Sequence, residues 1–272
     1  MEAVDFDKLF DEKLAEYMEL NKGKYTERQW ENLIPKLYRT FGDTYIKKYN
    51  ATPKQYYAKM DNDQLAKTLQ AHLEGEVPVP NFLCEEIEGR EMSLQLLSLL
   101  DSENTETLSY AINLLGANPI ALQKYLAIVV EGKGDEDVRD LAVDMLKEEA
   151  DVVADEAIAC YKKGASKDGM LEILSKVKTP REEVYEILLS AFLEYGEKTA
   201  IRASYLASYG DDRALPALLK RIEDRSIGFV EFQELKYAIE SLGGSYDEPR
   251  DFTDDNDFAL VGEASKKEGF SI

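Results

Sequence analysis

From about residue 81 onward, apolar residues recur at helical spacing in segments of roughly 11 to 15 residues, with very short turns between them. Two helices of this length cannot bury their own apolar faces, so each pair needs the next pair to complete a core. Two heptapeptides resemble each other, YAINLLG at 110–116 and YAIESLG at 237–243. Their separation is close to four units of about 32 residues, a period typical of helical repeats. The pattern predicts an all-α fold in which helix pairs stack along the chain.

The same period places further helix pairs between the two heptapeptides. First helices of these pairs are expected at 138–146, 170–177 and 201–210, of which the middle copy is the most degenerate. Second helices are expected at 119–130, 151–161, 180–195 and 212–222. Pro119 and Pro180 would occupy first-turn positions, where proline is tolerated. Thr179 and Glu182 would form a capping box.

The chain before position 81 differs in character. Aromatic side chains are dense there, which suits a small bundle, and helices are expected at 6–20, 26–41, 45–57 and 61–73. Pro35 should kink the second helix or leave a short first half. The best linker is 74–80 (EGEVPVP), because two prolines cannot lie inside a helix. We therefore predict, with the outer regions capping the array, an N-terminal helical region at 1–76, helical repeats at 81–244 and an acidic, partly ordered tail at 245–272.

One segment resembles a known repeat family. Residues 201–224 read IRASYLASYGDDRALPALLKRIED. They resemble the HEAT-like repeat, in the short variety first associated with phycobilisome lyases, through Ile201-Arg202, Leu206, Gly210-Asp211 and the run 213–219. Val138-Arg139 with Ala142 repeats the opening of that pattern, and a looser match covers about 104–244. The resemblance implies an α-solenoid of about four to five helix pairs whose concave groove holds partners. It does not imply lyase activity.

The chain carries a net charge of −21, from 54 acidic and 33 basic residues. Residues 1–60 are close to neutral, with 11 basic and 10 acidic residues, whereas residues 61–272 hold 22 basic and 44 acidic residues, a net of −22. Such a field repels the phosphate backbone of nucleic acids and attracts basic proteins or peptides. We therefore expect a partner with a basic surface and no nucleic acid. The basic, tyrosine-rich stretch 45–59 could dock on the acidic surface or contact a separate partner.

Targeting and membrane signals are not found in the sequence. The N-terminus carries Glu2, Asp5 and Asp7 where a signal peptide needs basic and then apolar residues. No stretch approaches the roughly 18 apolar residues of a membrane-spanning helix. Cys84 and Cys160 lie outside any Cys-x-x-Cys pair, which suits a reducing compartment. The expected location is the cytoplasm, without membrane contact.

Candidate reactive side chains are few. His72 is the single histidine, which removes Ser-His-Asp triads and most histidine-based metal sites. It lies beside Leu69 and Leu73 on the expected helix, so a packed or surface histidine is favoured, with a lone general base as the alternative. The apolar surroundings of Cys84 and Cys160 indicate inert core residues.

Acidic clusters at 135–137, 182–183 and 211–212 fall at expected helix starts, where negative charge offsets the helix dipole. The acidic stretch 247–257 supplies neither the glycine nor the twelfth-position glutamate of an EF-hand, and is interpreted as a solvated tail. The LxxLL pattern at 96–100 is expected to be buried against the next repeat. P-loop, dinucleotide-binding and nucleophile-elbow motifs are absent. We predict no catalytic, cofactor-binding or metal-ligating residue, and no cofactor.

Three functional hypotheses follow from these patterns. The favoured one is a non-catalytic protein–protein interaction module or scaffold that presents an acidic solenoid surface to a basic partner. The second is an enzyme of unrecognised type, with carboxylates and tyrosines in a cleft between the N-terminal bundle and the solenoid. The third is a structural protein that self-associates through an uncapped end of the array, so that both a monomer and a homodimer remain open.

Overall fold

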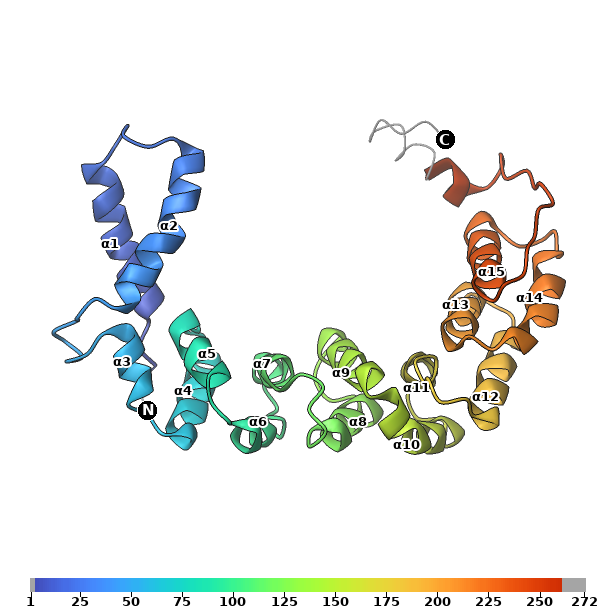
Figure 1. Cartoon of the computed structure of the whole chain (residues 1–272), viewed down its shortest axis with the longest axis horizontal. Helices are drawn as coiled ribbons and strands as arrows, with labels where there is room; N and C mark the ends of the chain where they lie inside the picture. The colour runs from blue at the N-terminus through green and yellow to red at the C-terminus, as the bar shows by residue number, and fades with distance from the viewer. Residues whose placement is uncertain (1–2, 261–272) are drawn as a thin grey trace. The chain divides into compact units, whose positions relative to one another are not determined.

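The structure is a computed structural model in which residues 3–260 are described (Figure 1). Within these residues the only β pairing is an isolated antiparallel bridge between Ile46 and Ala51, and everything else is helix, turn or loop. The all-α prediction is therefore confirmed. Among the same residues, no helix is both long enough and apolar enough to cross a membrane. The described chain divides into two compact units, made of residues 3–124 with 132–141, and of 125–131 with 142–260.

The first unit contains α1 to α7. Their bounds are α1 Phe6–Leu20, α2 Glu27–Gly42, α3 Pro53–Ala58, α4 Asn62–Glu74, α5 Asn81–Glu88, α6 Ser93–Leu99 and α7 Thr105–Leu115. Helices α1 and α2 pack on each other as a hairpin, α3 packs on α5, and α4 contacts α5, α6 and α7. The core is made of side chains that are almost fully buried, among them Phe6, Tyr57, Leu65, Leu69, Leu83 and Leu108.

Arg90 joins three helices of the first unit through polar contacts. Its guanidinium donates to the carbonyl oxygens of Ala58 at 3.0 Å and Met60 at 2.7 Å, and it forms an ion pair with Glu86 at 2.7 Å. The two carbonyls belong to the end of α3 and the chain between α3 and α4, and Glu86 lies on α5. Arg90 therefore satisfies backbone acceptors that the end of a short helix leaves free.

The second unit contains the later helices. Their bounds are α10 Ala150–Lys162, α11 Lys167–Leu174, α12 Glu182–Leu193, α13 Thr199–Tyr209, the 3-10 turn η1 Asp212–Ala214, α14 Leu215–Ile222 and α15 Phe229–Ser241. Helices α8 (Leu122–Glu131) and α9 (Glu136–Glu148) contribute residues to both units. Within the second unit α11, α13 and α15 lie in one row and α10, α12 and α14 in another (Figure 1). Within the first row α13 packs on both α11 and α15, and the two rows pack on each other through α10 with α11, α12 with α11 and α13, and α14 with α15.

Every second helix from α7 to α15 begins at an even spacing in the sequence, and the first and last of these helices carry the repeated heptapeptide. Helices α7, α9, α11, α13 and α15 begin at Thr105, Glu136, Lys167, Thr199 and Phe229, so that successive starts are almost equally far apart. The two heptapeptides have equivalent roles, because Ala111 and Ile112 in α7 are fully buried and so are Ala238 and Ile239 in α15. Each copy ends with a glycine at positive φ, Gly116 and Gly243.

Two predicted helix starts are wrong. The expected helices at 119–130 and 180–195 begin only at Leu122 and Glu182, so neither Pro119 nor Pro180 is a first-turn proline. The residue that caps α12 is Arg181, and no capping box forms at Thr179. At Thr179 a tertiary contact replaces the cap: the Asp151 carboxylate accepts the backbone N–H groups of Lys178 at 3.1 Å and Thr179 at 2.9 Å, so the Thr179 N–H is not free for Glu182.

Four further segments differ from or refine the sequence expectations. The helix expected at 45–57 is wrong in its first half: only Pro53–Ala58 is helical, because the bridge between Ile46 and Ala51 and the turn that it closes precede it. Helix α2 continues through Pro35 as one helix, so no short first half forms. The linker candidate 74–80 lies inside the first unit; whether 1–76 is a separate domain stays a prediction. Residues 246–258 are not a purely solvated tail. Phe252 and Phe258 pack edge-on against Phe229 of α15, with ring centroids 5.4 and 5.0 Å away. The rest of the predicted tail, 261–272, lies outside the described residues.

Candidate functional site

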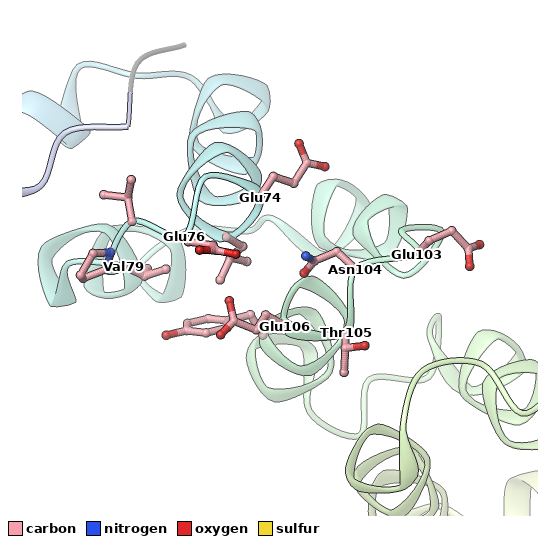
Figure 2. A pocket seen from close by; sticks show the side chains of 11 residues that line it. Glu74, Glu76, Val79, Glu103, Asn104, Thr105 and Glu106 are labelled. Carbon is pink, nitrogen blue, oxygen red and sulfur yellow. The ribbon is translucent and has the colours of Figure 1, made fainter.

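An acidic pocket with a volume of about 740 Å³ lies in the first unit. One wall is the end of α4 and the chain that leads to α5, and the other is the start of α7 (Figure 2). We call this cavity the acidic pocket; its lining consists of Leu73, Glu74, Glu76, Val77, Pro78, Val79, Glu103, Asn104, Thr105, Glu106 and Tyr110.

His72 fixes the first wall of the acidic pocket. Helix α4 ends at Glu74, and the chain then turns back so that the Val77 N–H donates to the His72 carbonyl at 2.9 Å. The Nδ1 atom of the His72 ring lies 2.8 Å from the carbonyl oxygen of Pro78, so Nδ1–H is the donor in this pair. Glu76 reaches its place at the rim with a φ of 52°, a conformation that few residues other than glycine adopt.

The second wall is built by the N-terminal cap of α7. The Asn104 side-chain oxygen accepts the Thr107 N–H at 2.8 Å and the Thr107 hydroxyl at 3.1 Å. Glu106 follows in the first turn of the helix, where a carboxylate is favoured by the helix dipole. Glu103 lies just before the cap and is 92% exposed. The helix start therefore favours the Glu106 carboxylate for a structural reason, and both Glu103 and Glu106 line the pocket.

The charge of the lining is entirely negative. Four glutamates and no lysine, arginine or histidine belong to it among the described residues. Two have neutralising or polar partners nearby: Glu74 accepts from Gln70 at 2.7 Å, and Glu103 lies 3.8 Å from the Lys133 ammonium. No three acidic, histidine or cysteine side chains in the described chain are placed to share one metal ion. The four glutamates of the lining favour ligands that carry positive charge.

A second polar cluster lies in the interior of the first unit. The Tyr38 hydroxyl donates to the Asp7 carboxylate at 2.6 Å, and the Tyr57 hydroxyl and His72 Nε2 are buried without a hydrogen-bond partner in the described structure. Burial raises the pKa of Asp7 above its usual value, against the hydrogen bond from Tyr38. Burial also lowers the pKa of His72. None of these side chains lines the acidic pocket.

A third candidate is a hollow of about 420 Å³ in the second unit. Its lining includes four serines and two tyrosines from the row of α11, α13 and α15, together with Lys147, Glu172 and Lys176. The Lys147 ammonium is paired with the carboxylates of Asp144 at 2.5 Å and Glu172 at 2.6 Å. This hollow carries charges of both signs, so it does not discriminate between cationic and anionic ligands as the acidic pocket does.

The reactive side chains named from the sequence are not brought together as a catalytic set. His72 is fully buried, as a packed histidine. Cys84 and Cys160 are free thiols but only half-buried, so the expectation that both are core residues is wrong. Each cysteine lies on a helix face that the neighbouring helices cover only in part. Burial raises the pKa of the Cys84 thiol to about 11, which keeps it protonated at neutral pH.

The acidic clusters and the LxxLL pattern have structural roles. The clusters at 135–137, 182–183 and 211–212 lie at the starts of α9, α12 and η1. The Asp135 carboxylate accepts the Val138 N–H at 3.0 Å, and Asp211 accepts the Arg213 N–H at 3.1 Å. Leu96, Leu99 and Leu100 of the LxxLL pattern are buried, which leaves them unable to bind a partner.

Sequence reasoning missed the acidic pocket. It identified 74–80 as a linker and gave no role to Glu103 or Glu106. The sequence offered one signal. Glutamates lie at the end of α4 and at the start of α7, and these two helix ends are far apart in the sequence. Only the packing of α4 on α7 makes those two ends adjacent.

Comparison with known proteins adds no relative. No protein-family model, no curated protein and no solved structure matches the chain.

Proposed function

We propose that the protein is a non-catalytic interaction module that holds a lysine- or arginine-rich segment of a partner protein in the acidic pocket. The observation that carries the proposal is the lining itself: four glutamates surround a cavity of about 740 Å³ with no cationic side chain among the described lining residues. The partner would supply the missing positive charge, and long basic side chains fill such a cavity while their stems cover its apolar residues.

We further propose that the helices from α7 onward form a HEAT-like solenoid that serves as the scaffold for this site. Two features support the proposal: the starts of every second helix recur at a nearly constant interval in sequence, and the alanine and isoleucine of the two heptapeptides are buried in the same way. Each pair would then complete its core against the next pair, as in helical repeat arrays. A scaffold of this kind holds the residues around a binding site in place and takes no part in catalysis.

The test uses the full chain and a fluorescently labelled octalysine peptide, with fluorescence anisotropy as the readout. The variant Glu74→Gln, Glu76→Gln, Glu103→Gln, Glu106→Gln removes the pocket charge at nearly constant volume. Each exposed charge pair is worth up to about 1 kcal/mol, so we expect the dissociation constant to rise about tenfold or more in about 50 mM salt. The difference should shrink in about 500 mM salt, where screening is strong.

The matched control is Glu186→Gln, Glu197→Gln, Glu223→Gln, Glu248→Gln in the second unit, because these side chains are exposed and the net charge changes by the same amount. We expect this control to weaken octalysine binding less than about twofold, since only the long-range field changes. If both variants lose the same affinity for octalysine, the peptide responds to net charge alone, and the pocket is not the binding site.

A further inference from the structure

The hairpin of α1 and α2 presents apolar side chains that the rest of the first unit does not cover. None of the residues from 11 to 40, all of which are described, is buried. In Figure 1 the turn between the two helices lies at the far end from α3, α4 and α5. Large apolar side chains on this stretch are Leu14, Tyr17, Met18, Leu20, Tyr25, Trp30, Leu33, Ile34 and Leu37. Tyr17, Met18 and Leu20 are exposed and the other six are half-buried, so the hairpin leaves an apolar surface that a further partner can cover.

An apolar hollow marks where that partner would contact the hairpin. Its volume is about 190 Å³, and it lies between α1 and α2. Its lining is Phe10, Lys13, Leu14, Tyr17, Leu37, Thr40, Phe41 and Thr44. The single charge in this lining, Lys13, is held with its ammonium 5.5 Å from the centre of the Phe41 ring. The hollow is therefore suited to an apolar side chain from another helix.

The charges of the hairpin are divided between its two halves. Residues 6–20, which form α1, hold five acidic and two basic residues, a net of −3. Residues 21–42, the turn and α2, hold two acidic and five basic residues, a net of +3. The hairpin as a whole is neutral in a chain of −21. It is thus complementary to another copy of itself, while most other surfaces of two copies would repel each other.

We propose that two copies of the chain associate through this hairpin, with α1 of each copy packed against α2 of its partner to form a four-helix bundle. A two-fold axis places the same patch on both sides of the interface. The acidic α1 then faces the basic α2 at two symmetric places, and the apolar stripes meet in the centre of the bundle. This association is separate from the proposed binding of a basic partner, because its residues do not line the acidic pocket.

The test is a charge-swap experiment on the full chain, read by sedimentation velocity. Glu12→Lys with Glu16→Lys changes the charge of α1 from −3 to +1, and Lys36→Glu with Arg39→Glu changes the turn and α2 from +3 to −1. All four side chains are exposed, so the fold is preserved. We expect the native chain to be a dimer at about 50 μM, and each variant alone to have its dimer dissociation constant raised at least about tenfold.

Mixing the two variants separates charge complementarity from a damaged fold. In the mixed pair an α1 of +1 faces an α2 of −1, and an α1 of −3 faces an α2 of +3, so dimers should return. A control pair, Glu186→Lys with Glu197→Lys in the second unit, should leave the native dimer unchanged. A native chain that stays monomeric at about 50 μM would overturn the proposal, as would variants that remain dimeric alone or fail to pair when mixed.

Discussion

His72 shows how one residue links the core of the first unit to the wall of the acidic pocket. Its ring is buried, Nδ1 lies 2.8 Å from the Pro78 carbonyl and Nε2 has no partner in the described structure. Burial lowers its pKa below the usual 6.5. The unfolded chain therefore takes up a proton at a higher pH than the folded chain does, and stability should fall as the pH drops through about 6.5. Urea unfolding between pH 7.5 and 5 measures this loss.

The variant His72→Asn isolates that effect. An asparagine amide can still donate to Pro78 but does not titrate, so the loss of stability between pH 7 and 5.5 should be reduced in the variant. The charged groups that act on the ring are Asp5 and Asp7, whose negative charge favours the protonated form. Asp7→Asn is the control, because removing that charge should enlarge the loss. An unchanged pH profile in His72→Asn would assign the loss to other groups.

At the residue level, sequence patterns predicted which side chains are packed better than which hydrogen bonds they form. The leucines at 69 and 73 favoured a packed or a surface histidine over a catalytic one, and the structure shows that His72 is packed. The hydrogen bond between His72 and the Pro78 carbonyl could not be predicted. It forms because the chain turns back after α4, and no local sequence pattern indicates that turn. For the cysteines, the packing prediction was wrong. An apolar neighbourhood in sequence suggested full burial, but both thiols belong to residues that stay only half-buried.

The helix starts at Thr26 and Asp61 were predicted, because a local cap decides them, whereas the start after Thr52 was missed. Thr26, Thr52 and Asp61 each form a capping box with a glutamine three residues later, and the helices begin directly after them. The start of α12 was wrong because Asp151, which lies far from Thr179 in sequence, competes for the same backbone N–H groups. A tertiary contact of this kind overrides a local cap and leaves no trace in the local sequence.

Two glycines that end helices differ in backbone conformation, and this difference gives a prediction. Gly116 after α7 has φ 56° and ψ −154°, a region that is essentially closed to other residues. Gly210 after α13 has φ 82° and ψ 20°, in the left-handed region that other residues enter at a moderate cost. An added Cβ would meet no atom within 4 Å at either position, so only the backbone matters.

We therefore expect Gly116→Ala to lower the free energy of unfolding by about 2–3 kcal/mol and Gly210→Ala by about 1 kcal/mol. Chemical denaturation of the full chain gives both values. The pair serves as its own control, because steric crowding is absent from both sites. Equal losses at the two positions would show that these loops relax to a common conformation in the variants.

For the molecule as a whole, composition gives the sign of the net charge but not the place where acidic side chains gather. The excess of acid after residue 60 led to the expectation of a basic partner, yet the acidic pocket depends on two segments that are separate in sequence. The second unit adds a contrast, since the hollow along α11, α13 and α15 is rich in serine and tyrosine and contains two lysines. If a basic partner binds as proposed, the net charge constrains its class, while the packing of helices decides where it binds.

If the helix pairs form a solenoid, damage in one part should stay local, because each pair is stabilised mainly by its neighbours. Leu206 on α13 is almost fully buried, and its truncation to alanine should cost about 2–5 kcal/mol. Hydrogen exchange followed by mass spectrometry should then speed up in α12 to α15 and remain unchanged in α3 to α7. Leu108→Ala on α7 is the reciprocal control, with the fast exchange confined to the first unit. Faster exchange throughout both units in either variant would indicate one cooperative core, and the solenoid proposal would have to be abandoned.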